Sequence, residues 1–305
     1  MFADGHVVSL YWENLSRSIS ERSFRDAKKL DVQLYSLQAA DQRASYKNKR
    51  HDDIVTHSVL AVPNIHNTGR LHGVLLVHIG MIVRLSNVMA PKLGLVKDKL
   101  GKVLKVELHE HDQMRFNTLP AGYHLFVPQF MAKGIWVQLQ NYKRSPLSAH
   151  IMPDAEHQRH GENTTANTAA QVMADAAVFI ELHHANFKCA VNIEGTQETV
   201  EVLRWQFPLT HGMLRTAHAA QGMTLRGGVI VDLRRGGGLV NDDWWLAIYV
   251  MLSRAQKLTN LLLVGFTEQV EDLLRRGPPT RLIWVTVMLE QRAKITLARY
   301  PDVLN

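Results

Sequence analysis

The sequence predicts an α/β fold in which a parallel sheet is interrupted by a small inserted β-barrel. Two apolar runs, residues 229–231 and 261–264, are short, lack alternation and are bounded by Gly or Asp, as expected of central strands buried on both faces. The helical segment between them contains no Gly and is too long for a hairpin loop, so it indicates a right-handed parallel crossover. Short strand patterns separated by turns between residues 71 and 200 favour the barrel.

The crossover helix also predicts where polar groups gather. Asp242 or Asp243 can cap this helix, whose apolar residues continue to about Ala255. In a parallel sheet the ends of strands and helices collect along one rim, where ligands bind. The residues expected at this rim, and therefore candidates for one site, are Gln221, Gly222, Asp232 and Arg254.

The N-terminal segment begins with a strand and a helix. Residues 7–12 predict the strand, and residues 13–30 have helical spacing. The residues expected to face inward from the helix are Leu15, Ile19, Phe24, Ala27 and Leu30. Residues 41–53 are polar and are expected to form a loop.

The middle of the chain predicts strands, and its end predicts a helix. Residues 71–87 read as two strands interrupted by Gly80. Further strand patterns lie at 103–108, 122–130, 135–139, 177–182 and 191–205. Residues 145–176 are polar and rich in His, Asn and Thr, which indicates a surface loop. A short helix over 268–276 is ended by Gly277, and no recognisable chemistry follows it.

Composition limits the classes of protein that fit. The 305 residues are 46% hydrophobic and 21% charged, enough for a substantial core and for two domains. The net charge of +7 is compatible with a polyanionic partner. The one cysteine, Cys189, excludes an internal disulfide framework and favours a reducing compartment. No run reaches the ~20 apolar residues that span a bilayer, and the N-terminus lacks signal-peptide features, so we expect a soluble, intracellular protein.

Two further patterns permit alternative interpretations. Basic residues of the middle segment alternate with Tyr123, Phe126, Trp136 and Tyr142, which is typical either of a nucleic-acid groove or of a solvated surface over an aromatic core. His109, Glu110, His111 and Asp112 suggest a metal site. Neither these residues nor the histidines of the polar loop at 145–176 have the i, i+4 spacing of a helical His pair. No metal site is therefore predicted.

Three motifs resemble a known family. Phe207-Pro208-Leu209 is followed by residues 216–222, Thr-Ala-His-Ala-Ala-Gln-Gly, and then by residues 249–254, Tyr-Val-Met-Leu-Ser-Arg. In order and spacing they resemble the last motifs of superfamily-one DNA helicases of the PIF/RecD kind, including those of Helitron-like elements. Residues 34–41 resemble the strand, ending in an acidic residue, that follows the helix corresponding to residues 13–30 in that family. Residues 71–103 resemble the segment that introduces its inserted barrel. Lys97-Asp98 here replaces the family's usual Asn-Gly, and Ala219 replaces its Lys.

The resemblance implies roles for individual residues. Arg254 would be the catalytic arginine that reaches the γ-phosphate of ATP, and Gln221 and Gly222 would join it in nucleotide binding. Thr216, His218 and Ser253 would face nucleic acid. Arg17, Arg22 and Arg25 all lie near the family's fourth motif, where an arginine can reach nucleotide phosphate; at least two of the three are expected to be solvated charges of the helix face. Asp232 is expected to anchor its strand end instead.

The resemblance covers most of this chain but only the back half of a helicase. No G-x-x-x-x-G-K-[ST] phosphate loop occurs in the sequence, so ATP and Mg²⁺ would be held mainly by a first RecA-like domain, upstream or in trans. The expected partner is DNA, single-stranded or at a duplex junction, with no membrane, in the nucleus or mitochondrion if the source is eukaryotic. The alternative is a non-enzymatic nucleic-acid-binding remnant. The isolated chain is not expected to hydrolyse ATP well.

The domain organisation follows from this interpretation. Residues 1–70 would be the first part of a second RecA-like domain, and residues 71–200 an inserted SH3- or OB-like β-barrel containing the polar loop at 145–176. Residues 201–277 would complete the RecA-like domain and carry the motifs, and residues 278–305 would be a C-terminal tail.

Overall fold

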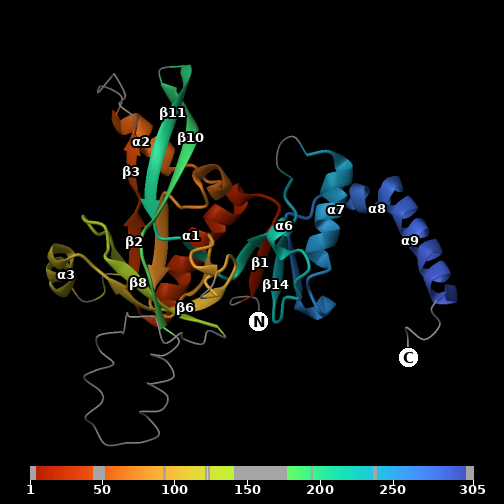
Figure 1. Cartoon of the computed structure of the whole chain (residues 1–305), viewed down its shortest axis with the longest axis horizontal. Helices are drawn as coiled ribbons and strands as arrows, with labels where there is room; N and C mark the ends of the chain where they lie inside the picture. The colour runs from red at the N-terminus through yellow and green to blue at the C-terminus, as the bar shows by residue number, and fades with distance from the viewer. Residues whose placement is uncertain are drawn as a thin grey trace, which may run out of the picture. The chain divides into compact units, whose positions relative to one another are not determined.

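The computed structural model describes residues 5–43, 52–91, 94–120, 122, 124–140, 177–193, 195–235 and 239–299. The chain divides into two compact units (Figure 1). The first unit comprises Met1–Leu15 and Arg215–Asn305, and the second comprises Ser16–Leu214. The domain boundaries expected at residues 70, 200 and 277 stay predictions, and the polar loop at 145–176 lies outside the described residues.

The first unit is built on a parallel sheet. Its strand order is β13-β1-β14-β15, with β1 at His6–Ser9 and β13 at Leu214–Thr216. β14 (Val229–Asp232) pairs in parallel with β1 on one side and with β15 (Leu261–Val264) on the other. Helix α7 (Asn241–Leu252) connects β14 to β15, so the parallel strand–helix–strand crossover predicted from the sequence is confirmed.

Helices cover the central strands of this sheet. Val8, Val229 and Val231 lie in one buried cluster with side chains of α7 and of α8 (Glu268–Arg275). The helical side chains of the cluster are Trp244, Ile248, Met251, Val270 and Leu273. Gly277 follows α8 at φ +76°, as the predicted helix end requires. The unit also contains α6 (Ala217–Ala220), the 3₁₀ turn η6 (Leu258–Asn260) and α9 (Thr280–Arg299).

Three expectations for the first unit were wrong. β15 is an edge strand of the described sheet, with Leu262, Leu263 and Val264 each about 40% exposed, because no strand lies beyond it there. Neither Asp242 nor Asp243 caps α7; the N-cap is Val240, and the two carboxylates lie in the first turn, where they suit the helix dipole. The first strand ends at Ser9, before the helix that begins at Trp12.

Helix α1 (Trp12–Leu30) follows β1 and continues into the second unit. Its burial only partly follows the helical spacing read from the sequence. Leu15, Ile19 and Ala27 are buried as predicted. Phe24 and Leu30 are exposed, so the apolar stripe is narrower than the sequence pattern indicates.

The described residues of the second unit form three sheets. A five-stranded antiparallel sheet has the order β12-β5-β6-β8-β9, and a small sheet has the order β4-β2-β7. Their strands are β2 (Leu34–Gln38), β4 (Val74–His78), β5 (Ile82–Leu85), β6 (Leu100–Glu107), β7 (Leu125–Phe126), β8 (Gly134–Leu139), β9 (Ala177–Ile180) and β12 (Leu209–His211). Gly80 separates β4 from β5 at φ +86°, as predicted. The unit also holds the 3₁₀ turn η3 (Ile65–Thr68) and α3 (Glu110–Asn117).

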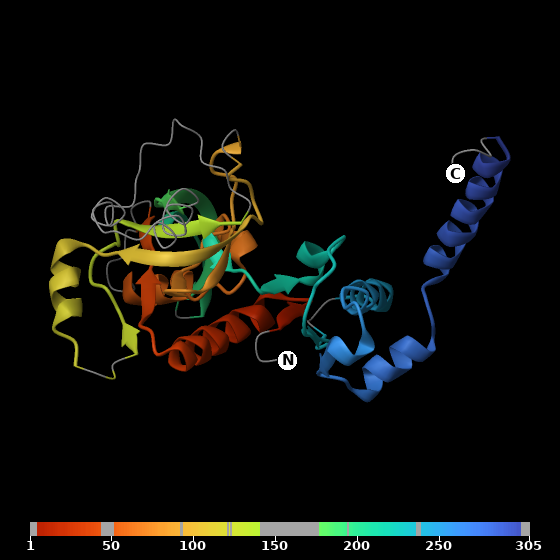
Figure 2. The same ribbon diagram turned by 90° about the horizontal axis from the view of Figure 1, so that it is seen from below.

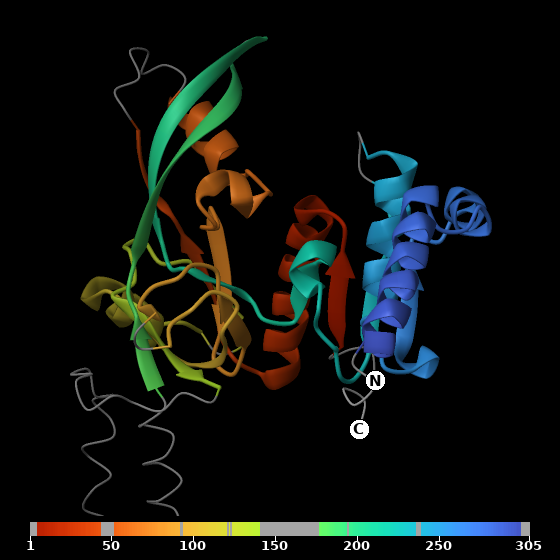
Figure 3. The same cartoon turned by 45° about the vertical axis from the view of Figure 1, so that its right-hand side comes forward.

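A long hairpin forms the third sheet. β10 (His183–Ile193) and β11 (Thr196–Gln206) pair along their whole length, and β3 (Ala40–Arg43) pairs with β11 (Figures 1 and 3). Helix α2 (Asp52–Leu60) packs against β10, and the two share a small core that includes Val55, Val59 and Cys189. β3 and α2 occupy parts of the segment predicted as a polar loop, so that prediction was wrong there. Burial raises the pKa of the Cys189 thiol.

The turn before β6 places Asp98 in the left-handed region, at φ +67°. Asp and Asn occupy this region more readily than other L residues, because their short polar side chains can bond locally. The Asp98 carboxylate accepts a 2.5 Å hydrogen bond from Nη1 of Arg84, which is buried. This ion pair helps to hold Asp98 in the turn.

A buried ion pair joins the third sheet to its surroundings. The Arg204 guanidinium, which is fully buried, donates two hydrogen bonds of 2.8 and 2.7 Å to the Asp41 carboxylate across the β11–β3 pair. It also donates to the carbonyl oxygens of Val59 and Leu71, and it lies 5.0 Å from the ring of Phe187. One side chain therefore fixes β3, the end of α2 and the hairpin together.

Two histidines of the second unit are held neutral. Burial and the charges of Arg84 and Arg204 lower the pKa of His72 to about 4, and its Nε2 lies 2.9 Å from the Thr210 hydroxyl. Burial, with nearby cations of which Arg22 is the strongest, lowers the pKa of His211 to about 3.

No helix of the described residues is long and apolar enough to cross a membrane.

Replacing Asp41 should test the buried ion pair. Asp41→Asn leaves the Arg204 charge buried without its carboxylate, which we expect to cost roughly 3–5 kcal/mol of unfolding free energy. Glu201→Gln breaks the solvent-exposed Lys188–Glu201 pair and should cost far less, because water screens it. Urea denaturation measures both. Equal costs for the two variants would show that the buried pair does not stabilise the unit.

Acid should destabilise the second unit through His72 and His211. Below about pH 6.5 the unfolded chain protonates both rings, whereas the folded protein protonates them only near pH 4 and pH 3. The free energy of unfolding should therefore decrease as the pH is lowered through this window. Urea denaturation between pH 7.5 and 5 measures the slope. The double variant His72→Gln, His211→Gln should show a shallower slope, and an unchanged slope would assign the pH dependence to other groups.

Candidate nucleotide-linked site

The Thr216–Gly222 motif forms a one-turn helix and a tight turn. Thr216 is the N-cap of α6, and its Oγ1 accepts a 3.2 Å hydrogen bond from the Ala219 backbone N–H. The Gln221 N–H donates to the His218 carbonyl at 3.2 Å and closes the helix. Thr216 is buried, whereas His218 and Gln221 are exposed. The polar side chains available to a ligand here are therefore those of His218 and Gln221.

Gly222 is required by the conformation of this turn. Its φ of +75° lies in the left-handed region that glycine occupies without strain. A Cβ placed there would meet no atom within 4 Å, so the surrounding space is open. The turn therefore exposes backbone that a phosphate or another chain can approach closely.

Arg254 lies just after α7, and its guanidinium is held by neutral acceptors. Nε donates to the Val250 carbonyl at 2.9 Å, Nη1 to the Met223 carbonyl at 2.9 Å and Nη2 to Ser253 Oγ at 2.8 Å. Among the described residues no carboxylate pairs with it. Its positive charge is therefore oriented by the protein but not neutralised by it.

The two motifs meet through this arginine. Met223 directly follows Gly222, so the hydrogen bond from Arg254 Nη1 joins the turn of the first motif to the end of the second. The Leu225 N–H donates to the Arg254 carbonyl at 3.0 Å, and Leu225 forms a parallel bridge with Ala255. The structure thus brings Gln221, Gly222 and Arg254 to one place, as residues of one site must be.

The other candidate residues of this unit are occupied within the protein. Ser253 Oγ accepts from Arg254 and donates to the Val250 carbonyl at 3.0 Å. The Asp232 carboxylate accepts hydrogen bonds from Nε and Nη2 of Arg234 at 2.8 and 2.7 Å, and from the Ser9 hydroxyl. Asp232 therefore anchors the end of β14 and is not brought into the site.

Sequence reasoning missed several neighbours of these motifs. The Met223 carbonyl is a backbone group, so no residue type could have signalled it. The rings of Trp245 and Tyr249 stack at 5.6 Å on α7, and the Arg235 guanidinium lies 5.0 Å from the Trp244 ring. The i, i+4 spacing of Trp245 and Tyr249 is a sequence signal that could have predicted their stacking.

Of the α1 arginines, only Arg22 is buried. It forms an ion pair with Asp26 at 3.2 Å. Arg17 and Arg25 are exposed and pair with Glu21 and Asp26, as solvated helix-face charges do.

The aromatic and acidic candidates of the second unit have structural roles. Phe126 and Trp136 are each 3% exposed, so these two rings belong to the core and cannot stack on bases; Tyr123 and Tyr142 lie outside the described residues. Asp112 is fully buried. Burial raises its pKa, but hydrogen bonds from the Gln129 and Phe130 N–H groups and from Arg115 outweigh this and lower it.

The described part of the chain contains no cluster of potential metal ligands. No group of three or more His, Cys, Asp or Glu residues is arranged there to hold an ion. His109 stacks on the ring of Phe130, and the His111 ring lies tilted against the same ring at 5.6 Å. The His109–Asp112 segment therefore forms the start of α3, with His109 as its N-cap.

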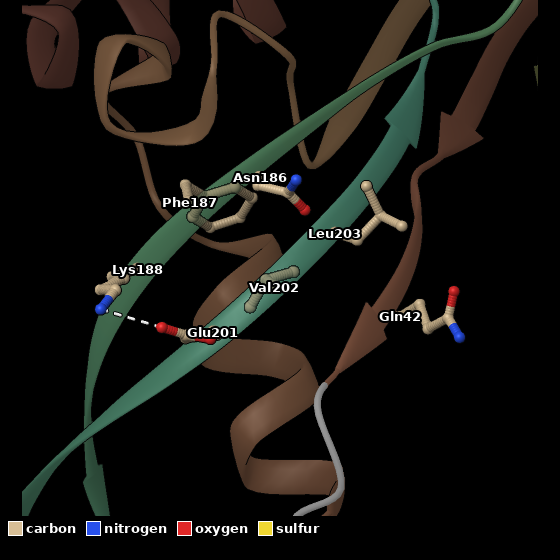
Figure 4. Close-up of a pocket in the computed structure, with 7 residues that line it drawn as sticks. All are labelled: Gln42, Asn186, Phe187, Lys188, Glu201, Val202 and Leu203. Carbon is tan, nitrogen blue, oxygen red and sulfur yellow. Dashed lines mark ion pairs between the residues drawn. The ribbon is translucent and has the colours of Figure 1, made fainter.

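A pocket lies on the hairpin sheet and is lined by residues of β3, β10 and β11 (Figure 4). Its volume is about 600 Å³. It is lined by Gln42, Asn186, Phe187, Lys188, Glu201, Val202 and Leu203. Lys188 Nζ and the Glu201 carboxylate pair at 2.9 Å, so the two charged groups of the pocket satisfy each other. None of the motif residues lines it.

Comparison with known proteins gives matches to solved structures alone. No protein-family model matches the sequence, and no curated protein matches it. A Bacteroides Pif1 bound to single-stranded DNA superposes with a TM-score of 0.49 at 13% identity, over 96% of this chain and 47% of that chain. The Candida albicans Pif1 helicase superposes with a TM-score of 0.46 at 17% identity, over 94% of this chain and 50% of that chain. The chain resembles Pif1 helicases along nearly its whole length.

A second Bacteroides structure, of Pif1 with ADP-AlF₃ and single-stranded DNA, gives a TM-score of 0.47 at 13% identity, over 94% of this chain and 46% of that one. This chain therefore spans about half the length of the Pif1 helicases it matches. At these identities the likeness concerns the fold alone.

Substitution of Gly222 should reveal the cost of its left-handed backbone. Gly222→Val should lower the free energy of unfolding by about 1–2 kcal/mol, because the space is open and only the conformation is unfavourable. Gly222→Asn should cost less, since Asn tolerates positive φ. Chemical denaturation of the two variants measures the difference. If Val and Asn prove equally tolerated, the turn does not hold this conformation in solution.

Proposed function

We propose that this chain is the second RecA-like half of a PIF/RecD-type, Helitron-like DNA helicase that couples ATP hydrolysis to strand separation. In this proposal part of the second unit is the inserted SH3- or OB-like barrel. The observation that carries the proposal is the 2.9 Å hydrogen bond from Arg254 Nη1 to the Met223 carbonyl, which joins the two motifs. Motifs that are far apart in the chain and act on one ligand must meet in this way.

The chemistry proposed for Arg254 follows from its surroundings. Its guanidinium is oriented by two carbonyls and one hydroxyl, so it keeps a full positive charge. A phosphate oxygen is a stronger acceptor than these neutral groups, and it can take over part of the guanidinium. Such an arginine stabilises the charge that develops on a transferred phosphoryl group, and it contributes about 10³–10⁵ in rate.

Gln221 and Gly222 would respond to the same ligand. A shift of Arg254 toward phosphate releases the Met223 carbonyl, which follows Gly222 directly, so movement of the arginine changes the turn. The phosphate loop and most Mg²⁺ ligands would come from a first RecA-like domain, upstream or in trans. This chain would supply the positive charge of Arg254 and the turn at Gln221 and Gly222, which responds when the arginine moves.

DNA, single-stranded or at a junction, is the partner we propose for the exposed side of α6. His218 is exposed and is the best placed of the three nucleic-acid candidates. The hydroxyls of Thr216 and Ser253 already bond within the protein, so their contribution would be to hold α6 and Arg254 in place. The isolated chain is expected to bind DNA without hydrolysing ATP well.

Fusion to the first RecA-like domain of a PIF-type helicase provides the test. The fusion protein should hydrolyse ATP when single-stranded DNA is added, and Arg254→Ala should lower this rate by about 10³-fold or more while DNA affinity stays unchanged. Arg275→Ala, which removes an exposed arginine of α8, is the matched control and should have no effect. Circular dichroism confirms that each variant is folded.

Two outcomes would contradict parts of the proposal. Unchanged turnover in the Arg254→Ala fusion would remove Arg254 from the mechanism. Salt-dependent DNA binding by a folded fusion protein that never hydrolyses ATP would favour the non-enzymatic remnant instead.

A further inference from the structure

Helix α9 leaves an unusually apolar surface uncovered. None of the twenty residues of this helix, drawn in dark blue in Figure 2, is buried. Residues 282–289 read Leu-Ile-Trp-Val-Thr-Val-Met-Leu, so apolar side chains point in every direction around the helix. Trp284 and Leu289 are each about 60% exposed. A helix that is apolar all round is stable only when other surfaces cover it.

The charges of α9 indicate what kind of surface this is. The helix carries Arg281, Arg292, Lys294 and Arg299 against the single acid Glu290, which gives a net charge of +3. None of these five groups forms an ion pair among the described residues. The surface that covers α9 should therefore combine apolar side chains with uncompensated acids.

The exposed side of α7 has this combination. Asp242 and Asp243 are exposed, form no ion pair within the described chain and lie on a helix that contains no basic residue. Tyr249 is 55% exposed and stacks on Trp245, and Val240 is 60% exposed at the start of the helix. These two carboxylates and three apolar side chains define the α7 face.

We propose that α9 of one copy of this chain docks on the α7 face of a second copy. The exchange is reciprocal, so a two-fold symmetric dimer covers both α9 helices and both α7 faces at once. Basic side chains of α9 then meet Asp242 and Asp243 of the other copy, while Trp284 and its neighbours pack on the aromatic pair. The surface is independent of the helicase function proposed above.

The mass of the full chain in solution tests the dimer. Light scattering after gel filtration should give twice the 34.6 kDa of one chain at micromolar concentration. Trp284→Glu with Leu289→Glu should yield a monomer with unchanged secondary structure. Gln291→Glu on the same helix is the matched control and should remain dimeric. A wild-type monomer would overturn the proposal. Hydrogen exchange that shows α9 protected within a single chain would also overturn it.

A charge swap tests the pairing of the two helices. Asp242→Lys with Asp243→Lys, and separately Arg292→Glu with Lys294→Glu, should each weaken the dimer by roughly tenfold, because like charges then face each other. All four changes in one chain should restore the wild-type dissociation constant to within about threefold. Added salt should reduce every one of these differences. If the combined variant is weaker than either pair alone, α9 does not dock on the α7 face.

Discussion

The hydrogen bond between Arg254 and the Met223 carbonyl is the interaction on which the candidate site depends. It is the side-chain bond between the turn after α6 and the end of α7, and the backbone bond from Leu225 to the Arg254 carbonyl reinforces it. Because all three acceptors of the guanidinium are neutral, its charge remains available to an anion while its position is fixed. The parallel sheet provides the scaffold, since β14 and β15 begin and end at matching residues.

The sequence predicted elements better than their places in a sheet. The strand–helix–strand segment was predictable because apolar runs and a Gly-free helix are local patterns. That β15 lies at an edge was not predictable, since this depends on which strand lies beside it. The start of α7 was misjudged for a related reason. Asp242 is a good N-cap by type, but the chain enters the helix at Val240, so the acid contributes through the helix dipole instead.

The candidate site shows the same division between local pattern and spatial arrangement. The rim rule for parallel sheets grouped Gln221, Gly222, Asp232 and Arg254, and their membership of one site stays a prediction. Arg254 bonds to Met223, next to Gly222, whereas Asp232 pairs with Arg234. Ser253 accepts a hydrogen bond from the neighbouring arginine, a contact that its residue type did not reveal. Trp136 shows that an aromatic residue among lysines does not reveal whether its ring faces solvent or the core.

The core between α2 and the hairpin has a consequence for redox chemistry. Cys189 is the one sulfhydryl of the chain, and it is 8% exposed beside Val55, Val59 and Val191. Thiolate is the form that oxidants and alkylating reagents attack, and burial disfavours it at this position. The thiol of the folded protein should therefore react with such reagents more slowly than that of the unfolded chain, so its rate of alkylation reports how often the core between α2 and the hairpin opens.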